Sequence, residues 1–153
     1  MFDYILFDLD GTLTDPKQGI CTCVQYALKS FGIEEPDLDK LTPFIGPPLK
    51  DSFMEFYGMS AEEAERAIVT YRERFSTVGK FENEVYEGVP EMLKALRASG
   101  KTLILATSKP TVFAEIILDH FGLRQYFDVV VGSELDGRRV NKDEVVACAL
   151  EEA

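Results

Sequence analysis

The sequence predicts an α/β fold: a parallel β-sheet of about three strands, joined by helical crossovers and interrupted by a long helical insertion. Three observations support this prediction. Short, nearly continuous apolar runs end at turn-forming residues, as strands buried on both faces of a parallel sheet do. Helical patterns lie between the later runs. Residues 15–85 contain helical patterns but no convincing strand pattern.

The first expected strand is the apolar run over residues 4–9, which stops at an Asp-Gly-Thr turn signal. The insertion follows it directly. Within the insertion, Ser60 and Glu63 are spaced as a capping box. The helices expected there span residues 17–31, 50–57 and 61–79, with a short one near Leu38.

The next part of the chain alternates helices and strands. A helix is expected over residues 89–98 and a strand over 102–106, after a glycine stop signal. A second helix over 112–121 follows a proline, which the first helical turn tolerates, and precedes a strand over 127–131. This order predicts a parallel α/β unit with right-handed crossovers.

The last expected helix, over residues 141–153, has no capping glycine and no strand after it. Three strands are fewer than a sheet usually has. We therefore expect an incomplete record of a longer α/β protein, with a natural three-stranded minimal fold as the alternative. The expected domains are an α/β core of residues 1–14 and 86–153 and a helical domain of residues 15–85.

Composition excludes several classes of protein. The chain has 27 acidic and 16 basic residues and a formal charge of -11, so we expect neither a nucleic-acid nor a membrane partner. An anionic substrate would then need a bound cation. Three cysteines and one histidine give no basis for a zinc site or a disulfide framework and favour a reducing compartment, the cytoplasm. There is neither a membrane-span pattern nor a basic leader.

Two carboxylates follow the first expected strand, at the sheet edge where open α/β folds bind ligands. Asp8 and Asp10 repel one another unless a cation lies between them, and Mg²⁺ suits such a pair. A carboxylate can attack phosphorus, and a neighbouring carboxyl can move the protons. Gly11 would let backbone N–H groups approach phosphoryl oxygens. An isolated motif of this kind would more often be a solvated turn.

Embedded after a buried strand, these residues resemble the haloacid dehalogenase superfamily of phosphohydrolases, in its phosphoglycolate phosphatase-like branch. The family's first motif is matched by Asp8, Asp10, Gly11 and Thr12. The resemblance implies that Asp8 is the nucleophile and a Mg²⁺ ligand. It implies that Asp10 is the general acid/base, with a backbone carbonyl that also binds the metal, and that Gly11 and Thr12 contact the substrate.

The second and third motifs are expected later in the chain. Thr107 matches a hydroxyl that contacts the phosphoryl group, with Ser108 beside it; an N-cap of the following helix is the alternative for Thr107. Lys142 is the candidate for the lysine that neutralises the nucleophile and the phosphoryl charge, although Asp143 stands where the family commonly has proline. Lys109 is the rival lysine. The fourth motif, a pair of acids that completes the Mg²⁺ site, would lie beyond the end of this sequence.

The helical insertion resembles the family's α-helical cap, which closes over the site. The loop over residues 44–50 resembles the cap loop that faces the substrate. Lys50 is the candidate contact for an anionic leaving group, with an exposed helix lysine as the alternative. Five aromatic residues at helical spacing are expected in the cap core, namely Phe53, Phe56, Tyr57, Tyr71 and Phe75.

The resemblance implies a Rossmann-like core and a Mg²⁺-dependent phosphomonoester hydrolase that works through an aspartyl-phosphate. The substrate would be a small phosphorylated metabolite such as phosphoglycolate. The alternatives are a 5'-nucleotidase, a sugar-phosphate phosphatase or a phosphomutase of the same family. A different class remains open as well, a truncated and inactive domain that binds phosphometabolites.

Overall fold

A parallel sheet of three strands organises the α/β part of the chain in the computed structural model, which describes residues 3–153. The strands β1 (Tyr4–Phe7), β4 (Thr102–Pro110) and β5 (Val129–Ser133) lie in the order β1-β4-β5. In this register Tyr4 is opposite Thr102, and Ile104 is opposite Val129. The predicted fold class is confirmed.

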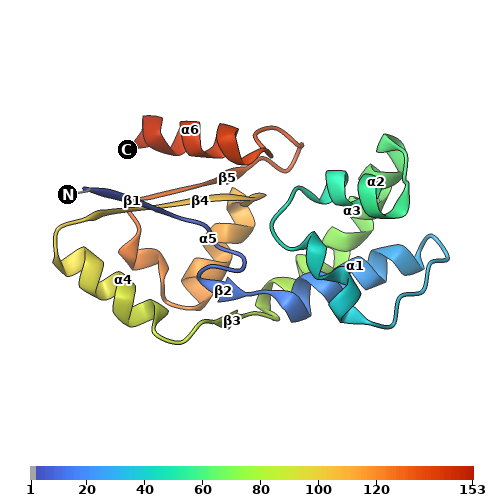
Figure 1. The fold of residues 1–153 in the computed structure, drawn as a ribbon, viewed down its shortest axis with the longest axis horizontal. Helices are drawn as coiled ribbons and strands as arrows, with labels where there is room; N and C mark the ends of the chain where they lie inside the picture. The colour runs from blue at the N-terminus through green and yellow to red at the C-terminus, as the bar shows by residue number, and fades with distance from the viewer. Residues whose placement is uncertain (1–2) are drawn as a thin grey trace. The chain divides into compact units, whose positions relative to one another are not determined.

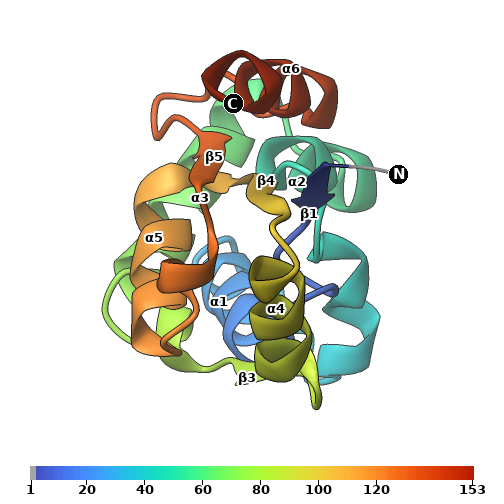
Figure 2. The same cartoon turned by 90° about the vertical axis from the view of Figure 1, so that its left-hand side faces the viewer.

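Helices cover both faces of this sheet. Helices α4 (Val89–Ala98) and α5 (Thr111–His120) lie on one face, and α6 (Lys142–Glu152) lies on the other (Figure 1, Figure 2). The apolar face of α6 explains its position, because it completes a core with β4 and β5. That core consists of the buried residues Ile104, Ala106, Val131, Val145 and Ala149.

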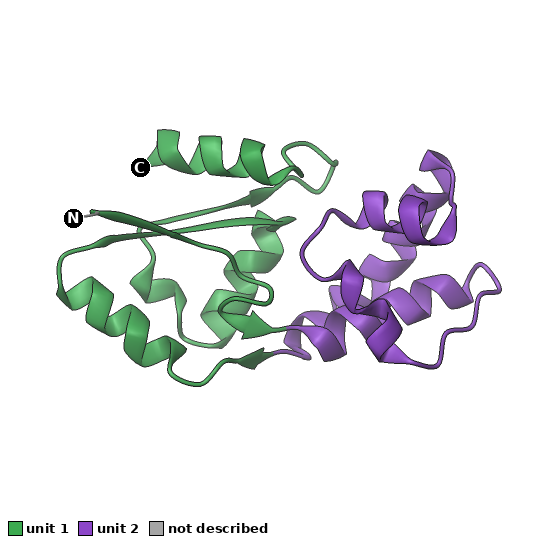
Figure 3. Cartoon of the chain, viewed as in Figure 1, with its two compact units in different colours: residues 1–15, 84–153 green, residues 16–83 purple. Residues whose placement is uncertain are grey.

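The chain divides into two compact units, residues 1–15 with 84–153 and residues 16–83 (Figure 3). The second unit contains helices and no strand among its residues. Its elements are α1 (Lys17–Lys29), a 3₁₀ segment (Leu38–Phe44), α2 (Leu49–Tyr57), α3 (Ala61–Phe75) and a 3₁₀ turn (Gly79–Phe81). The predicted capping box of α3 is present, with Ser60 and Glu63 exchanging hydrogen bonds of 3.0 and 3.2 Å.

Some boundaries differ from the sequence prediction. Two strand pieces, β2 (Thr14–Asp15) and β3 (Glu84–Val85), form an antiparallel ladder where no strand was expected. A ladder of this length is too short to show a period of two in the sequence. The helix expected over residues 61–79 ends at Phe75, and β4 continues to Pro110 through the expected turn.

The aromatic prediction for the helical unit is correct for three residues, because Phe53, Tyr71 and Phe75 are buried. It is wrong for Phe56, which is 45% exposed. Its ring contacts that of Phe44 at a centroid distance of 5.6 Å, but α2 turns its other side to solvent. Within residues 3–153, no helix combines the length and the apolar character that crossing a bilayer requires.

Candidate active site

The turn after β1 presents two aspartates in the α/β unit. Leu9 and Leu13 are fully buried, which anchors the turn on both sides of Asp10. The carbonyl of Leu9 accepts the N–H of Leu13 at 2.9 Å. Gly11 has a φ of 78°, a left-handed conformation that favours glycine, and its N–H donates to the carbonyl of Thr14 at 2.8 Å. The N–H of Gly11 is thus used within the turn.

Asp8 is the more exposed of the two aspartates, with 40% of its side chain accessible. Its Oδ1 accepts the N–H of Leu9 at 2.8 Å and lies 3.0 Å from Nζ of Lys142. Lys142 also donates a hydrogen bond to the carbonyl of Ala106 in β4. Within residues 3–153, both contacts that the structure gives to Asp8 therefore use Oδ1. They fix the carboxylate and leave Oδ2 available to a ligand.

Asp10 is enclosed, with 8% of its side chain exposed. Its Oδ2 lies 3.2 Å from Nζ of Lys109, whose side chain is 6% exposed. Within the described residues, the buried Oδ1 accepts no hydrogen bond. Burial raises the pKa of Asp10, the nearby Lys109 opposes that rise, and the charge of Asp8 adds to it.

The second predicted motif lies in β4 rather than after it. Thr107 is buried, and its Oγ1 accepts the N–H of Lys109 at 3.1 Å. Thr107 is not the N-cap of α5, because that position belongs to Pro110, which makes no side-chain cap. The Thr107 oxygen instead accepts the N–H of the residue two positions later. A hydroxyl that accepts in this way can still donate its own proton to another group. Ser108 lies half-buried between Thr107 and Lys109.

Lys142 and Lys109 each contact a different aspartate. The sequence predicted a lysine beside Asp8 and treated Lys109 only as its rival, so the contact of Lys109 with Asp10 was missed. The available signal was the place of Lys109 in the loop of the second motif. Lys50 lies in the helical unit, where its Nζ is 3.2 Å from Oε1 of Glu65. Its contact with a leaving group stays a prediction.

The donor set at this edge fits a magnesium ion of the kind that binds one or two carboxylates and completes its shell with water and substrate oxygens. Asp8 offers a half-exposed carboxylate, whereas the carboxylate of Asp10 is enclosed and held by Lys109. Residues 3–153 hold no cluster of three or more His, Cys, Asp or Glu side chains that could bind a metal. These residues therefore fit Mg²⁺ only with further oxygen ligands.

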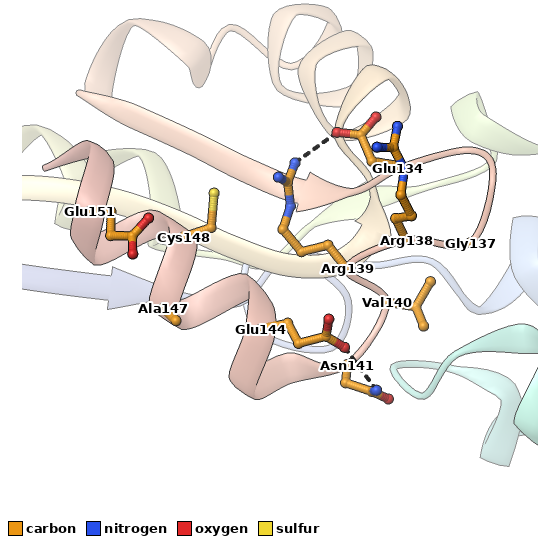
Figure 4. A pocket seen from close by; sticks show the side chains of 10 residues that line it. All are labelled: Glu134, Gly137, Arg138, Arg139, Val140, Asn141, Glu144, Ala147, Cys148 and Glu151. Atoms are coloured by element: carbon orange, nitrogen blue, oxygen red, sulfur yellow. Dashed lines mark hydrogen bonds and ion pairs between the residues drawn. The ribbon is translucent and has the colours of Figure 1, made fainter.

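A pocket of about 680 Å³ lies elsewhere in the α/β unit, between the loop after β5 and helix α6 (Figure 4). Its lining contains neither aspartate. Within the lining, Nη2 of Arg139 lies 3.0 Å from Oε1 of Glu134, and the amide of Asn141 donates to Glu144 at 2.9 Å (Figure 4). The lining carries three glutamates and two arginines, so its formal charge is -1 and does not favour a phosphorylated ligand.

Comparisons with known proteins give matches over nearly the whole chain. A family model described as haloacid dehalogenase-like hydrolase matches residues 5–152. A 5'-nucleotidase of Pseudomonas aeruginosa is 52% identical over 147 residues, which cover 96% of this chain and 66% of that protein. The tyrosine-protein kinase PtkA of Mycobacterium tuberculosis is 41% identical over 95% of this chain and 50% of its own length.

A solved structure shows the same arrangement of the backbone. The crystal structure of a predicted phosphatase from Clostridium acetobutylicum has a TM-score of 0.98 and 50% sequence identity, over 99% of this chain and 70% of that one. The chain thus spans 66% and 50% of the lengths of the two curated relatives.

Proposed function

Because the chain belongs to the haloacid dehalogenase-like hydrolase family, we propose that it carries the catalytic residues of a Mg²⁺-dependent phosphomonoester hydrolase. The observation that supports this most strongly is the orientation of Asp8. One of its carboxylate oxygens is held by a backbone N–H and by Lys142, at the carboxyl end of β1 and two residues before the enclosed Asp10. An oriented carboxylate at this place supports covalent catalysis by Asp8.

The proposed reaction begins at Asp8. Its Oδ2 attacks phosphorus, the bond between phosphorus and the ester oxygen breaks, and that oxygen takes a proton from Asp10. An aspartyl-phosphate and a free alcohol result. Lys142, which contacts Asp8, stabilises the charge on the carboxylate and on the phosphoryl oxygens, and the hydroxyl of Thr107 donates its proton to one of those oxygens.

Hydrolysis of this intermediate restores the site. Asp10, now a carboxylate, takes a proton from a water molecule, whose oxygen attacks phosphorus. The bond between phosphorus and Asp8 breaks, inorganic phosphate leaves, and Asp10 is again protonated. Mg²⁺, when bound by Asp8 and the backbone carbonyl of Asp10, supplies positive charge that offsets the two carboxylates and the phosphoryl group. Residues 15–85 are proposed as the cap, with Lys50 facing the leaving group.

The substrate class is a small phosphorylated metabolite. The name of the Pseudomonas relative favours nucleoside 5'-monophosphates, and the resemblance to the phosphoglycolate phosphatase branch favours 2-phosphoglycolate. The Mycobacterium relative is named as a kinase, so a second candidate function is transfer of the phosphoryl group to an acceptor other than water. Measuring free phosphate against phosphorylated acceptor separates the two.

The experiment uses the full-length gene product that contains these residues, with p-nitrophenyl phosphate, uridine 5'-monophosphate and 2-phosphoglycolate as substrates. Asp8→Asn is expected to lower kcat/KM by at least about 10³-fold, because the nucleophile is lost. The matched control is Asp119→Asn, which changes an exposed aspartate of α5 in the same unit. Acid quenching and mass spectrometry should find phosphate on the peptide that contains Asp8.

Equal rates for wild type and Asp8→Asn would refute the proposal, as would turnover that does not depend on added Mg²⁺. A wild-type protein that binds the three esters but turns none over would favour the inactive binding domain instead.

A further inference from the structure

The two aspartates of the site contact different lysines, and this division has a functional consequence. Lys142 reaches Asp8 from α6, with about half of its side chain accessible. Lys109 reaches Asp10 from the end of β4, and both of these side chains are nearly inaccessible. Water screens a half-exposed ion pair in part, whereas a buried pair fixes both partners more strongly, since separating them leaves a charge without water.

The backbone of Lys109 is itself held in place. Its N–H donates to Oγ1 of Thr107 at 3.1 Å. Its carbonyl lies so close to β5 that a Cβ at Gly132 would be 2.3 Å from it, so only glycine fits there. Thr111 closes the arrangement, because its Oγ1 accepts the N–H of Gly132 at 2.8 Å.

The direction of the Asp10 carboxylate depends on where this backbone places the Lys109 side chain. Lys109 is the side chain that the structure pairs with its Oδ2, and in residues 3–153 its Oδ1 accepts no hydrogen bond. Within the described residues, the ion pair with Lys109 is therefore the side-chain contact that restrains the direction of the Asp10 carboxylate.

We propose that Lys109 is a positioning residue for Asp10, which holds the general acid/base in line with the leaving-group oxygen. This inference rests on the proposed function. Lys109 acts through Asp10 and touches no reacting atom. Removal of Lys109 should therefore slow the cleavage of esters whose leaving oxygen must gain a proton. It should leave the cleavage of esters whose leaving oxygen needs no proton nearly unchanged.

Two classes of ester separate these steps. The phenolate of p-nitrophenyl phosphate leaves without a proton, whereas uridine 5'-monophosphate and 2-phosphoglycolate release alkoxides that need one. The value of kcat/KM reports the steps from free enzyme and substrate up to release of the alcohol. The ratio of kcat/KM for an alkyl ester to that for an aryl ester therefore measures how much protonation by Asp10 contributes. A purely structural role of Lys109 would lower both values by the same factor.

The experiment measures this ratio in the full-length gene product for wild type, Lys109→Met, Lys109→Arg and Asp10→Asn, with the faster of the two alkyl esters. Lys109→Met should lower the ratio by at least about tenfold, within the range that a general acid supplies. Lys109→Arg keeps the positive charge, so its ratio should stay closer to the wild-type value than that of Lys109→Met. Lys94→Met, an exposed lysine of α4, is the matched control and should leave the ratio unchanged.

A double variant tests whether Lys109 acts through Asp10 alone. In the Asp10→Asn background, Lys109→Met should lower the ratio no further, because the group that it positions is already gone. The double variant also carries no unpaired buried charge. If circular dichroism shows that Lys109→Met alone does not fold, Lys109→Gln, which keeps an N–H donor, is measured in its place.

Equal losses for the alkyl and aryl esters would overturn the inference, and so would a further fall in the Asp10→Asn background. Failure of the proposed function looks different, because the wild-type protein would then hydrolyse neither ester or Asp8→Asn would remain active. That result would overturn this inference together with the function.

Discussion

Replacement of Gly132 by alanine tests how closely β4 and β5 approach at the site. The added Cβ would lie 2.3 Å from the carbonyl oxygen of Lys109 and 2.7 Å from the backbone nitrogen of Thr111. Both atoms belong to the backbone, so no side chain can rotate away to make room. The two segments would have to separate by about 1 Å to restore ordinary van der Waals contact.

The energetic cost follows from this movement. Overpacking of a tight contact costs about 1–3 kcal/mol. Separation also weakens the hydrogen bond from the Gly132 N–H to Oγ1 of Thr111, which measures 2.8 Å, and its loss costs about 1 kcal/mol more. We expect Gly132→Ala to lower the free energy of unfolding by about 2–4 kcal/mol.

Urea titration of the full-length gene product, followed by circular dichroism, measures this change as a lower midpoint at unchanged slope. The sign of the effect is decisive. The φ of Gly132 lies outside the left-handed region, so alanine without a clash would stabilise the protein by about 0.4–1 kcal/mol through the unfolded chain. Unchanged or increased stability would refute the argument. Gly100→Ala, where the Cβ meets nothing within 4 Å but φ is 83°, isolates the cost of backbone conformation.

Three further predictions concern other parts of the fold. Gly19→Ala would place a Cβ 2.2 Å from the carbonyl oxygen of Gly79, so it should destabilise the helical unit by about 1–3 kcal/mol in a urea titration, and an unchanged midpoint would speak against the close approach. Ser60→Ala removes the N-cap bond of α3 and should cost about 1 kcal/mol, most of which Ser60→Asp should restore; equal losses in both would contradict the capping role. Arg97 and a backbone N–H of β4 hold the pKa of Asp128 below 3.8, so the stabilisation is present above that pH and disappears as pH falls through the lower, folded value. Thermal melts between pH 2 and 5 should show this loss in wild type and a flatter acid limb in Arg97→Gln, and parallel curves would exclude the pair as its cause.

Much of the candidate site could be predicted because it is local in sequence. An apolar strand followed at once by Asp8 and Asp10 needs no knowledge of the rest of the chain, since the turn and the alternation of side chains place both acids. The bounds of α4 and the capping box of α3 were predicted for the same reason, because their signals lie within a few residues of one another. The positions of Thr107 and Lys142 followed from the order of motifs, not from any contact.

The partners of the two lysines were decided only by the tertiary structure. Lys109 and Lys142 both have charges and lengths that could serve Asp8, and no local pattern tells which lysine reaches which acid. The parallel pairing of β1 with β4 brings Lys109 to Asp10. The packing of α6 on the face of the sheet opposite α4 and α5 brings Lys142 to Asp8. The exposure of Phe56 and the ladder of β2 with β3 were also missed. These features depend on contacts between segments far apart in the chain, and such contacts leave no periodic signal in either segment alone.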